Sequence, residues 1–199
     1  MNTRRWMIPV AALLGVLVAL LALSLRSKPH EFIGTVFADE EVAPDFTLTA
    51  DSGEPASLSD YRGDVVLLYF GYTYCPDVCP TVLANLAAVR ETLSQTDRDR
   101  VQVVMVSVDP ARDTPDVLHT YLEHFDPSFV GFTGSSDEIA KVAAAYNVTY
   151  EAHEGTAATG YLVDHWAGFY LVDPGGNLVE SFSYGTPAVD VAADVREWL

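Results

Sequence analysis

Positive charge is scarce in this chain. Its 199 residues include 11 Lys and Arg against 28 Asp and Glu. Four of the cations (Arg4, Arg5, Arg26 and Lys28) lie in the first 28 residues, so the rest of the chain holds seven cations against all 28 acids, a net charge of −21. A body this acidic repels phosphate backbones and anionic lipid headgroups, which excludes nucleic-acid binding and membrane docking through a basic patch.

Cysteine is also rare, because Cys75 and Cys79 are the only two in the sequence. Neither follows the apolar run near the N-terminus, which excludes a lipid anchor attached to a cysteine at that point. The length fits one domain of ordinary size with a short appendage. Since 49% of the residues are hydrophobic, the body has enough apolar material to form a packed core.

The N-terminal segment has the composition of a membrane anchor. Residues 6–25 carry no charge and are flanked by arginines; as a helix, this run spans about 30 Å, the thickness of a bilayer's hydrocarbon core. We therefore predict one transmembrane helix within residues 1–28. The alternative is a cleaved signal peptide, for which residues 22–24 offer only a marginal cleavage site. Residues 29–42 lack periodicity and are expected to form a tether, with the folded domain covering residues 43–199.

Hydrophobic periodicity in the body alternates between strand and helix patterns. The chain order is strand, helix, strand, helix, strand, helix, then a hairpin and a last helix, which is typical of a thioredoxin-like α/β domain with a central mixed sheet flanked by helices. The predicted strands cover residues 65–70, 101–108, 129–132, 169–172 and 178–183, and the predicted helices cover 80–93, 114–124, 136–146 and 187–199.

The two cysteines stand four positions apart at the C-terminal end of the predicted buried strand 65–70. Pro80 suits the first position of the following helix, so Cys79 is expected beside the helix N-terminus, where free N–H groups favour a thiolate. If the loop folds as a turn, the two Cα atoms approach within about 6 Å, which suits a disulfide or two sulfurs on one metal. A purely structural disulfide is the simpler alternative, but closing so short a loop stabilises the fold weakly.

Three separated motifs resemble the Sco/SenC family. They are residues 71–80 (GYTYCPDVCP), 107–115 (SVDPARDTP) and 161–165 (YLVDH). Residues 43–46 (APDF) add weaker support, because peroxiredoxins and reductases share them. Together these segments span nearly the whole body in the family's order, and the chain is identified on them as a Sco/SenC member.

The resemblance implies a membrane-anchored, thioredoxin-like metallochaperone that binds copper and helps to assemble cytochrome c oxidase. By the family's pattern, Cys75, Cys79 and His165 are the copper ligands. The implied partners are the copper-bearing subunit of the oxidase and a copper donor protein. Because an oxidase copper site and a persistent dithiol both belong outside the reducing cytoplasm, we expect residues 29–199 on the outer face of the cell membrane.

His165 competes with four other histidines for the role of third ligand: His30, His119, His124 and His153. His165 is distinguished by its position just before the strand 169–172, in the loop that thioredoxin-like folds place opposite the dithiol. Two thiolates and a neutral imidazole suit Cu(I) in a trigonal site and also hold Cu(II). Zinc accepts the same atoms, but a structural zinc site usually has a fourth protein ligand, and none is obvious here.

Several residues near these motifs have two interpretations. Asp77 and Asp164 either orient the ligands or cap turns. Asp109, Arg112 and Asp113 follow the second strand and either pair with each other to fix that loop or shape a partner surface. Three aromatic residues either shield the site from water or pack in the core: Tyr72, Tyr74 and Trp166.

The alternative to copper handling is a thiol–disulfide oxidoreductase that reduces a partner's cysteines without a metal. His165 separates the two functions, because metal binding needs the imidazole and disulfide exchange does not. A peroxidase is disfavoured, because peroxiredoxins place a threonine three residues before their cysteine, whereas Thr73 is two before Cys75.

Overall fold

The computed structural model describes residues 30–156 and 160–199, and the predicted anchor within residues 1–28 lies outside them. None of the helices in those two ranges is both long enough and apolar enough to cross a bilayer. The compact unit begins at Phe32 and continues to Leu199.

The core of this unit is an eight-stranded mixed sheet with the strand order β1-β10-β9-β4-β5-β6-β2-β3. β4, β5 and β6 run parallel, and β9 and β2 flank them in antiparallel orientation. The strands are β1 (Thr35–Val42), β2 (Thr47–Ala50), β3 (Pro55–Ser57), β4 (Val65–Gly71), β5 (Val101–Ser107), β6 (Val130–Thr133), β9 (Phe169–Val172) and β10 (Asn177–Phe182). Every residue of β4 is buried, as its continuous apolar run predicts.

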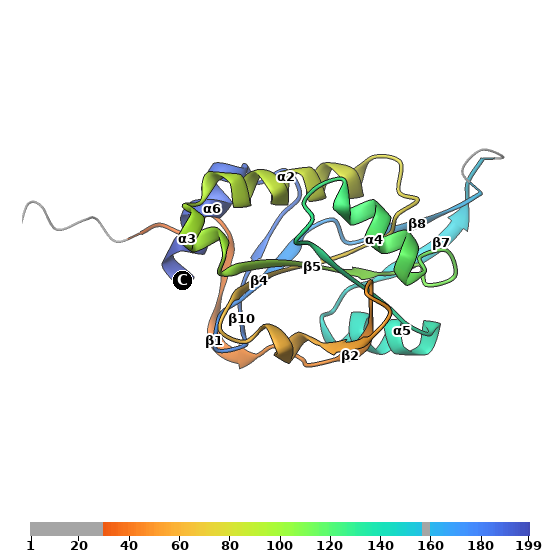
Figure 1. The fold of residues 1–199 in the computed structure, drawn as a ribbon, viewed down its shortest axis with the longest axis horizontal. Helices are drawn as coiled ribbons and strands as arrows, with labels where there is room; N and C mark the ends of the chain where they lie inside the picture. Colours follow the sequence, from red (N-terminus) through yellow and green to blue (C-terminus); the bar gives the residue numbers. More distant parts are fainter. Residues whose placement is uncertain (1–29, 157–159) are drawn as a thin grey trace, which may run out of the picture. The chain divides into compact units, whose positions relative to one another are not determined.

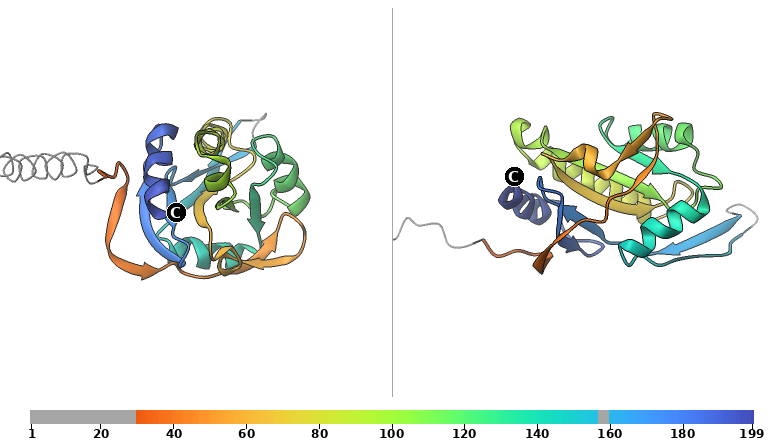
Figure 2. Two further views of the ribbon diagram at one scale, coloured as in Figure 1. Left: turned by 60° about the vertical axis from the view of Figure 1, so that its left-hand side comes forward. Right: turned by 90° about the horizontal axis from the view of Figure 1, so that it is seen from below.

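Helices cover both faces of the sheet. α2 (Val78–Thr92), α4 (Pro115–Glu123) and α6 (Ala188–Trp198) lie on one face, and α5 (Ser136–Ala145) lies on the other (Figures 1 and 2). Two short helical segments complete the unit, η1 (Leu58–Tyr61) and α3 (Gln95–Arg98). This arrangement confirms the predicted mixed α/β architecture of thioredoxin type.

The predicted helix starts agree with the capping chemistry. The Thr114 hydroxyl accepts a hydrogen bond from the Val117 N–H at the start of α4, where Pro115 is the first helical residue. α5 begins with a capping box in which the side chains of Ser135 and Glu138 satisfy each other's backbone N–H groups. α2 differs from the prediction, because it begins at Val78, two residues before Pro80.

Two regions contradict the prediction of irregular structure. Residues 29–42 were predicted as a tether, but Thr35–Val42 forms β1, which pairs with β10 at one edge of the sheet. The segment before it is also tied to the body, because the N–H groups of Ile33 and Gly34 donate to the Asp194 carboxylate over 2.9 and 3.1 Å. The second region is an antiparallel pair outside the main sheet, β7 (Tyr150–Glu154) and β8 (Tyr161–His165).

Candidate metal centre

The structure brings the three predicted ligands together at the C-terminal edge of the parallel strands. Cys75 lies in the loop after β4, Cys79 is the second residue of α2, and His165 ends β8. Their two Sγ atoms and one imidazole nitrogen all lie within 4.8 Å of one another. Cys79 Sγ is 3.3 Å from His165 Nε2. In the part of the chain that the structure describes, no other cluster of His, Cys, Asp and Glu is tight enough to hold a metal ion.

The two thiols differ in their electrostatic surroundings. The Cys79 N–H donates a 3.4 Å hydrogen bond to Cys75 Sγ. Hydrogen bonds from the Cys79 thiol and from the main-chain N–H groups of Cys79 and Asp77, together with the adjacent His165 ring, outweigh desolvation and lower the pKa of Cys75 to about 3. Burial, followed by the contact with Cys75, raises the pKa of Cys79 well above its ordinary value. The prediction that the helix N-terminus favours a thiolate at Cys79 is therefore wrong: its N–H groups serve Cys75.

His165 is oriented by its own strand and by the residue after it. Its Nδ1 lies 3.0 Å from the Trp166 carbonyl oxygen, so Nδ1 carries the proton and Nε2 presents its lone pair to the sulfurs. The residue was predicted in a loop, but it lies in β8 and pairs with Tyr150 of β7. The Val163 N–H donates a 3.1 Å hydrogen bond to the Tyr72 hydroxyl, which fixes β8 to the loop that carries Cys75.

The predicted shielding aromatics have different roles. The buried Tyr72 ring meets the His165 ring edge-on, with centroids 5.8 Å apart. Trp166 packs instead on Tyr170, at a centroid distance of 4.6 Å. Tyr74 is 54% exposed and lies over the Arg112 guanidinium.

Tyr69 is a site residue that the sequence analysis missed. It is fully buried in β4, and its ring lies 6.0 Å from the His165 ring. Burial, with the neighbouring Cys79 as the next cause, raises the pKa of Tyr69, so the phenol keeps its proton. The available signal was a single hydroxyl-bearing residue in an otherwise apolar run, two positions before Gly71.

The acidic residues mostly fix loops. The Asp164 side chain is 86% exposed and lies 3.6 Å from His153, so it does not orient a ligand. Asp77 is the N-cap of α2, but its side chain makes no capping hydrogen bond. Asp113 is buried and accepts hydrogen bonds from the Thr73 hydroxyl (2.6 Å) and the Ser107 hydroxyl (2.6 Å), which joins the ends of β4 and β5.

Arg112 links this edge of the sheet to the strand that carries His165. Its Nε pairs with the Asp109 carboxylate, as the loop-fixing interpretation predicts. Its Nη1 donates a 3.0 Å hydrogen bond to the Tyr161 carbonyl oxygen, and its guanidinium lies 3.7 Å from the Tyr161 ring centroid. Asp109 also accepts a hydrogen bond from the Tyr161 hydroxyl. The start of β8 is therefore held by one buried ion pair.

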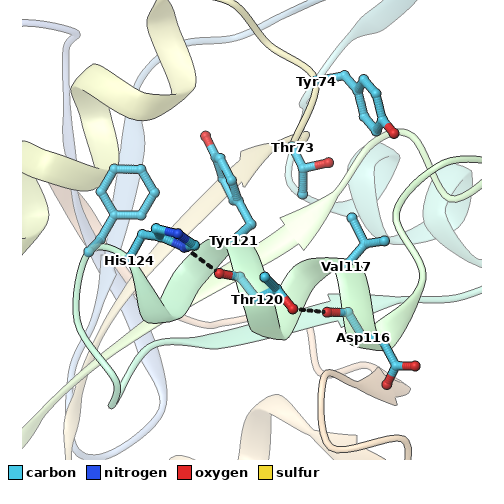
Figure 3. Close-up of a pocket in the computed structure, with 8 residues that line it drawn as sticks. Thr73, Tyr74, Asp116, Val117, Thr120, Tyr121 and His124 are labelled. Carbon is cyan, nitrogen blue, oxygen red and sulfur yellow. Dashed lines mark hydrogen bonds between the residues drawn. The ribbon is translucent and has the colours of Figure 1, made fainter.

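An open apolar groove of about 700 Å³ adjoins the cysteine loop (Figure 3). Thr73 and Tyr74 form one side, and Val117 and Tyr121 of α4 line the other. Phe125, which follows α4, is a further lining residue. The loop that carries Cys75 therefore borders an open apolar recess.

The donor set fits copper. Two sulfurs and one imidazole nitrogen are soft to borderline ligands, which suit trigonal Cu(I) and also hold Cu(II). Cys75 is half-buried whereas Cys79 is fully buried, so the site opens to solvent on the Cys75 side.

The chain is similar to several known proteins. The family described as SCO1/SenC matches residues 36–199. An SCO2-like protein of Rickettsia felis is 35% identical over 91% of this chain and 90% of its own length. The solution structure of apo Sco1 from Thermus thermophilus superposes with a TM-score of 0.76 at 39% identity, covering 87% of this chain and 100% of that one. Copper-bound ScoI of Bradyrhizobium japonicum superposes with a TM-score of 0.72 at 37% identity, covering 79% of this chain and 99% of that one. The chain therefore belongs to the SCO1/SenC family.

Proposed function

We propose that this protein binds one copper ion through Cys75, Cys79 and His165 and acts in the assembly of cytochrome c oxidase. The observation that carries the proposal is the convergence of the two sulfurs and the imidazole nitrogen within 4.8 Å. Copper is the cargo of this site. When it binds, the Cys79 thiol gives up its proton, Cys75 contributes its sulfur as thiolate, and Nε2 of His165 supplies the third lone pair.

The family relationship supports the same function. A relative has been solved with copper bound, and the Sco family is described as a family of cytochrome c oxidase assembly proteins. We infer that the recipient is the copper-bearing subunit of the oxidase and that a separate donor protein supplies the metal. The half-buried Cys75 beside the apolar groove is the point at which a partner's ligand approaches the site.

The proposal includes a location. We infer that residues 1–28 anchor the chain in the cell membrane and that the domain works on the outer face, where the dithiol avoids the reducing cytoplasm. An enzyme reporter fused to the C-terminus tests this: activity of a periplasm-dependent reporter is expected, and activity of a cytoplasm-dependent one contradicts it.

A second function, thiol–disulfide exchange with the oxidase cysteines, is favoured by one specific observation. The half-buried Cys75 has its pKa lowered to about 3, as in cysteines that attack disulfides. The buried Cys79, whose N–H contacts the Cys75 sulfur, is placed to resolve the mixed disulfide.

The test is complementation under copper limitation. Cells that lack the chain are supplied with wild type, Cys75→Ser, Cys79→Ser or, as a control at an exposed position, Ser183→Ala, and oxidase activity is measured. Loss of activity is expected with both cysteine variants, and added copper is expected to restore part of it by mass action. Full oxidase activity with Cys75→Ser at wild-type abundance contradicts the proposal.

A further inference from the structure

Tyr69 carries a buried hydroxyl that lacks a well-formed hydrogen bond in the described ranges. The side chain is 0% exposed, and the side chain that this hydroxyl contacts as a hydrogen-bonding group is the Cys79 thiol. Several other tyrosines near the core do have partners: Tyr146 donates to the Pro44 carbonyl, Tyr170 to the Tyr146 carbonyl and Tyr161 to Asp109. Because leaving a buried polar group unpaired destabilises a fold, such an orphan is a sign of function.

The position of Tyr69 connects this hydroxyl with the metal site. A Cβ atom built on Gly71 would lie 2.6 Å from Tyr69 Cε1 and 3.1 Å from Cys79 Sγ. The absence of a side chain at Gly71 therefore lets the phenol and the Cys79 thiol share one pocket. The Tyr69 ring also meets the His165 ring at an interplanar angle of 70°. Tyr69 thus lies against two of the three proposed ligands, on the buried side of the site.

We propose that the Tyr69 hydroxyl donates a hydrogen bond to the Cys79 sulfur when that sulfur binds copper. A neutral thiol is a weak acceptor, so the hydroxyl has no adequate partner in the metal-free protein. A metal-bound thiolate carries negative charge and is a strong acceptor. When copper binds, the hydroxyl therefore gains a good hydrogen-bond acceptor. The free energy of this hydrogen bond adds to the affinity for copper.

The same hydrogen bond favours Cu(I) over Cu(II). Hydrogen bonds to a ligating sulfur tune the redox properties of copper sites. A thiolate bound to Cu(II) gives more of its electron density to the metal than one bound to Cu(I), so its sulfur accepts a weaker hydrogen bond. Tyr69 is accordingly a positioning and tuning residue, and its removal weakens Cu(I) binding more than Cu(II) binding.

Thr133 supplies a control. Its hydroxyl is also buried without a hydrogen-bond partner, but it lies on β6, which β5 separates from β4 in the sheet. Thr133→Val therefore removes a buried, unpaired hydroxyl outside the proposed ligand set.

The experiment compares the full-length chain as wild type, Tyr69→Phe and Thr133→Val. The inference rests on the proposed copper site. For Tyr69→Phe we expect a metal-free melting temperature equal to or above that of wild type, and a Cu(I) affinity about tenfold lower by chelator competition. We also expect its sulfur-to-Cu(II) absorption to move to longer wavelength, because the sulfur becomes more electron-rich. Thr133→Val is expected to match wild type in all copper measurements.

A stronger donor gives an independent check. Replacing Tyr69 by 3-fluorotyrosine keeps the ring and strengthens the donor, so the absorption is expected to move to shorter wavelength. Copper affinity and absorption of Tyr69→Phe equal to those of wild type overturn the inference and leave the copper site intact. A wild-type chain that forms no coloured copper complex overturns both the inference and the proposed function.

Discussion

The main-chain N–H of Cys79 points at the sulfur of Cys75, 3.4 Å away. This contact gives the two cysteines different charge states. The first turn of α2 stabilises negative charge on Cys75, which precedes the helix, and not on Cys79, which lies within it. One sulfur is held as an accessible thiolate, while the other stays protonated in a buried pocket until a metal or a disulfide replaces its proton.

The first prediction concerns the pH dependence of thiol reactivity. Because its folded pKa lies near 3, below the ordinary 9.0, Cys75 is a thiolate throughout the neutral range. Its alkylation rate by iodoacetamide is expected to change less than about threefold between about pH 5 and about pH 8. Mass spectrometry of the labelled peptides measures the rate for each cysteine. The guanidinium-unfolded chain is the control, with a rate that rises about tenfold per pH unit in this range. The same steep rise in the folded chain contradicts the assignment.

The second prediction concerns Arg112, whose guanidinium binds Asp109 and the Tyr161 carbonyl oxygen. Arg112→Ala leaves a buried carboxylate unpaired and is expected to lower the free energy of unfolding by about 3 kcal/mol. The amides of residues 161–165 are expected to exchange hydrogen faster, with weaker copper binding as a consequence. Arg112→Lys should rescue little, because an ammonium lacks the planar fork.

Arg62→Ala is the matched control for this prediction. Arg62 also donates to a carbonyl oxygen, that of Gly175, at the opposite end of β9 from the site. Unchanged exchange at residues 161–165 in Arg112→Ala would show that the strand carrying His165 is held by other contacts.

The parts of the fold that the sequence predicts are those with a strong apolar pattern. β4 and β5 are almost fully buried, and their continuous apolar runs identify them. The sequence did not predict β7. Four of its five residues are exposed, so the segment lacks the alternation of buried and exposed residues that identifies a strand. β1 is a charged edge strand whose place depends on pairing with β10, a contact that local sequence does not encode.

The three residues that the sequence singles out do lie together in the structure, but the expected position of the thiolate was wrong. Cys75 and Cys79 were identified by their spacing, and the family motifs supplied the rest of the ligand set. Both signals are properties of the sequence alone. The assignment of the thiolate depended on where α2 begins, and helix ends are uncertain by one or two residues. Because Asp77 is the N-cap, Cys79 lies inside the first turn, and its N–H faces back toward Cys75.

The third prediction concerns stability and pH. Glu180 is fully buried in β10, accepts a 2.9 Å hydrogen bond from Trp198 Nε1, and has its pKa raised to about 8 by burial first and by the neighbouring Asp194 next. Its folded pKa lies above the unfolded value near 4.5, so its contribution to stability is complete below that unfolded value. The contribution is lost as the pH rises through about 8.

Glu180→Gln keeps the acceptor for Trp198 and removes the titration. Urea unfolding of the metal-free chain is expected to show a free energy that falls between about pH 5 and about pH 9 in wild type and falls less in Glu180→Gln. Glu91→Gln, a change at an exposed position on α2, should retain the wild-type slope. Parallel pH profiles for wild type and Glu180→Gln would refute the assignment.

The last prediction separates copper handling from thiol exchange and uses two histidines at opposite ends of the β7–β8 pair. His165 Nε2 lies 3.3 Å from Cys79 Sγ, whereas His153 faces Asp164. In His165→Ala the remaining two thiolates still hold Cu(I) linearly but suit Cu(II) poorly, so Cu(II) affinity is expected to fall at least about a hundredfold and Cu(I) affinity much less. Disulfide exchange should persist, because the dithiol and the start of α2 remain.

In cells with limited copper, His165→Ala should then give low oxidase activity, and His153→Ala should give the wild-type level. Both variants are compared at equal abundance, and exchange activity is measured on the same preparations with a disulfide substrate. Normal oxidase activity in His165→Ala together with intact exchange activity would mean that the dithiol acts without the imidazole. Thiol–disulfide exchange would then be the better assignment than copper delivery. Copper binding requires the His165 imidazole and disulfide exchange does not, so a dispensable His165 excludes the copper function.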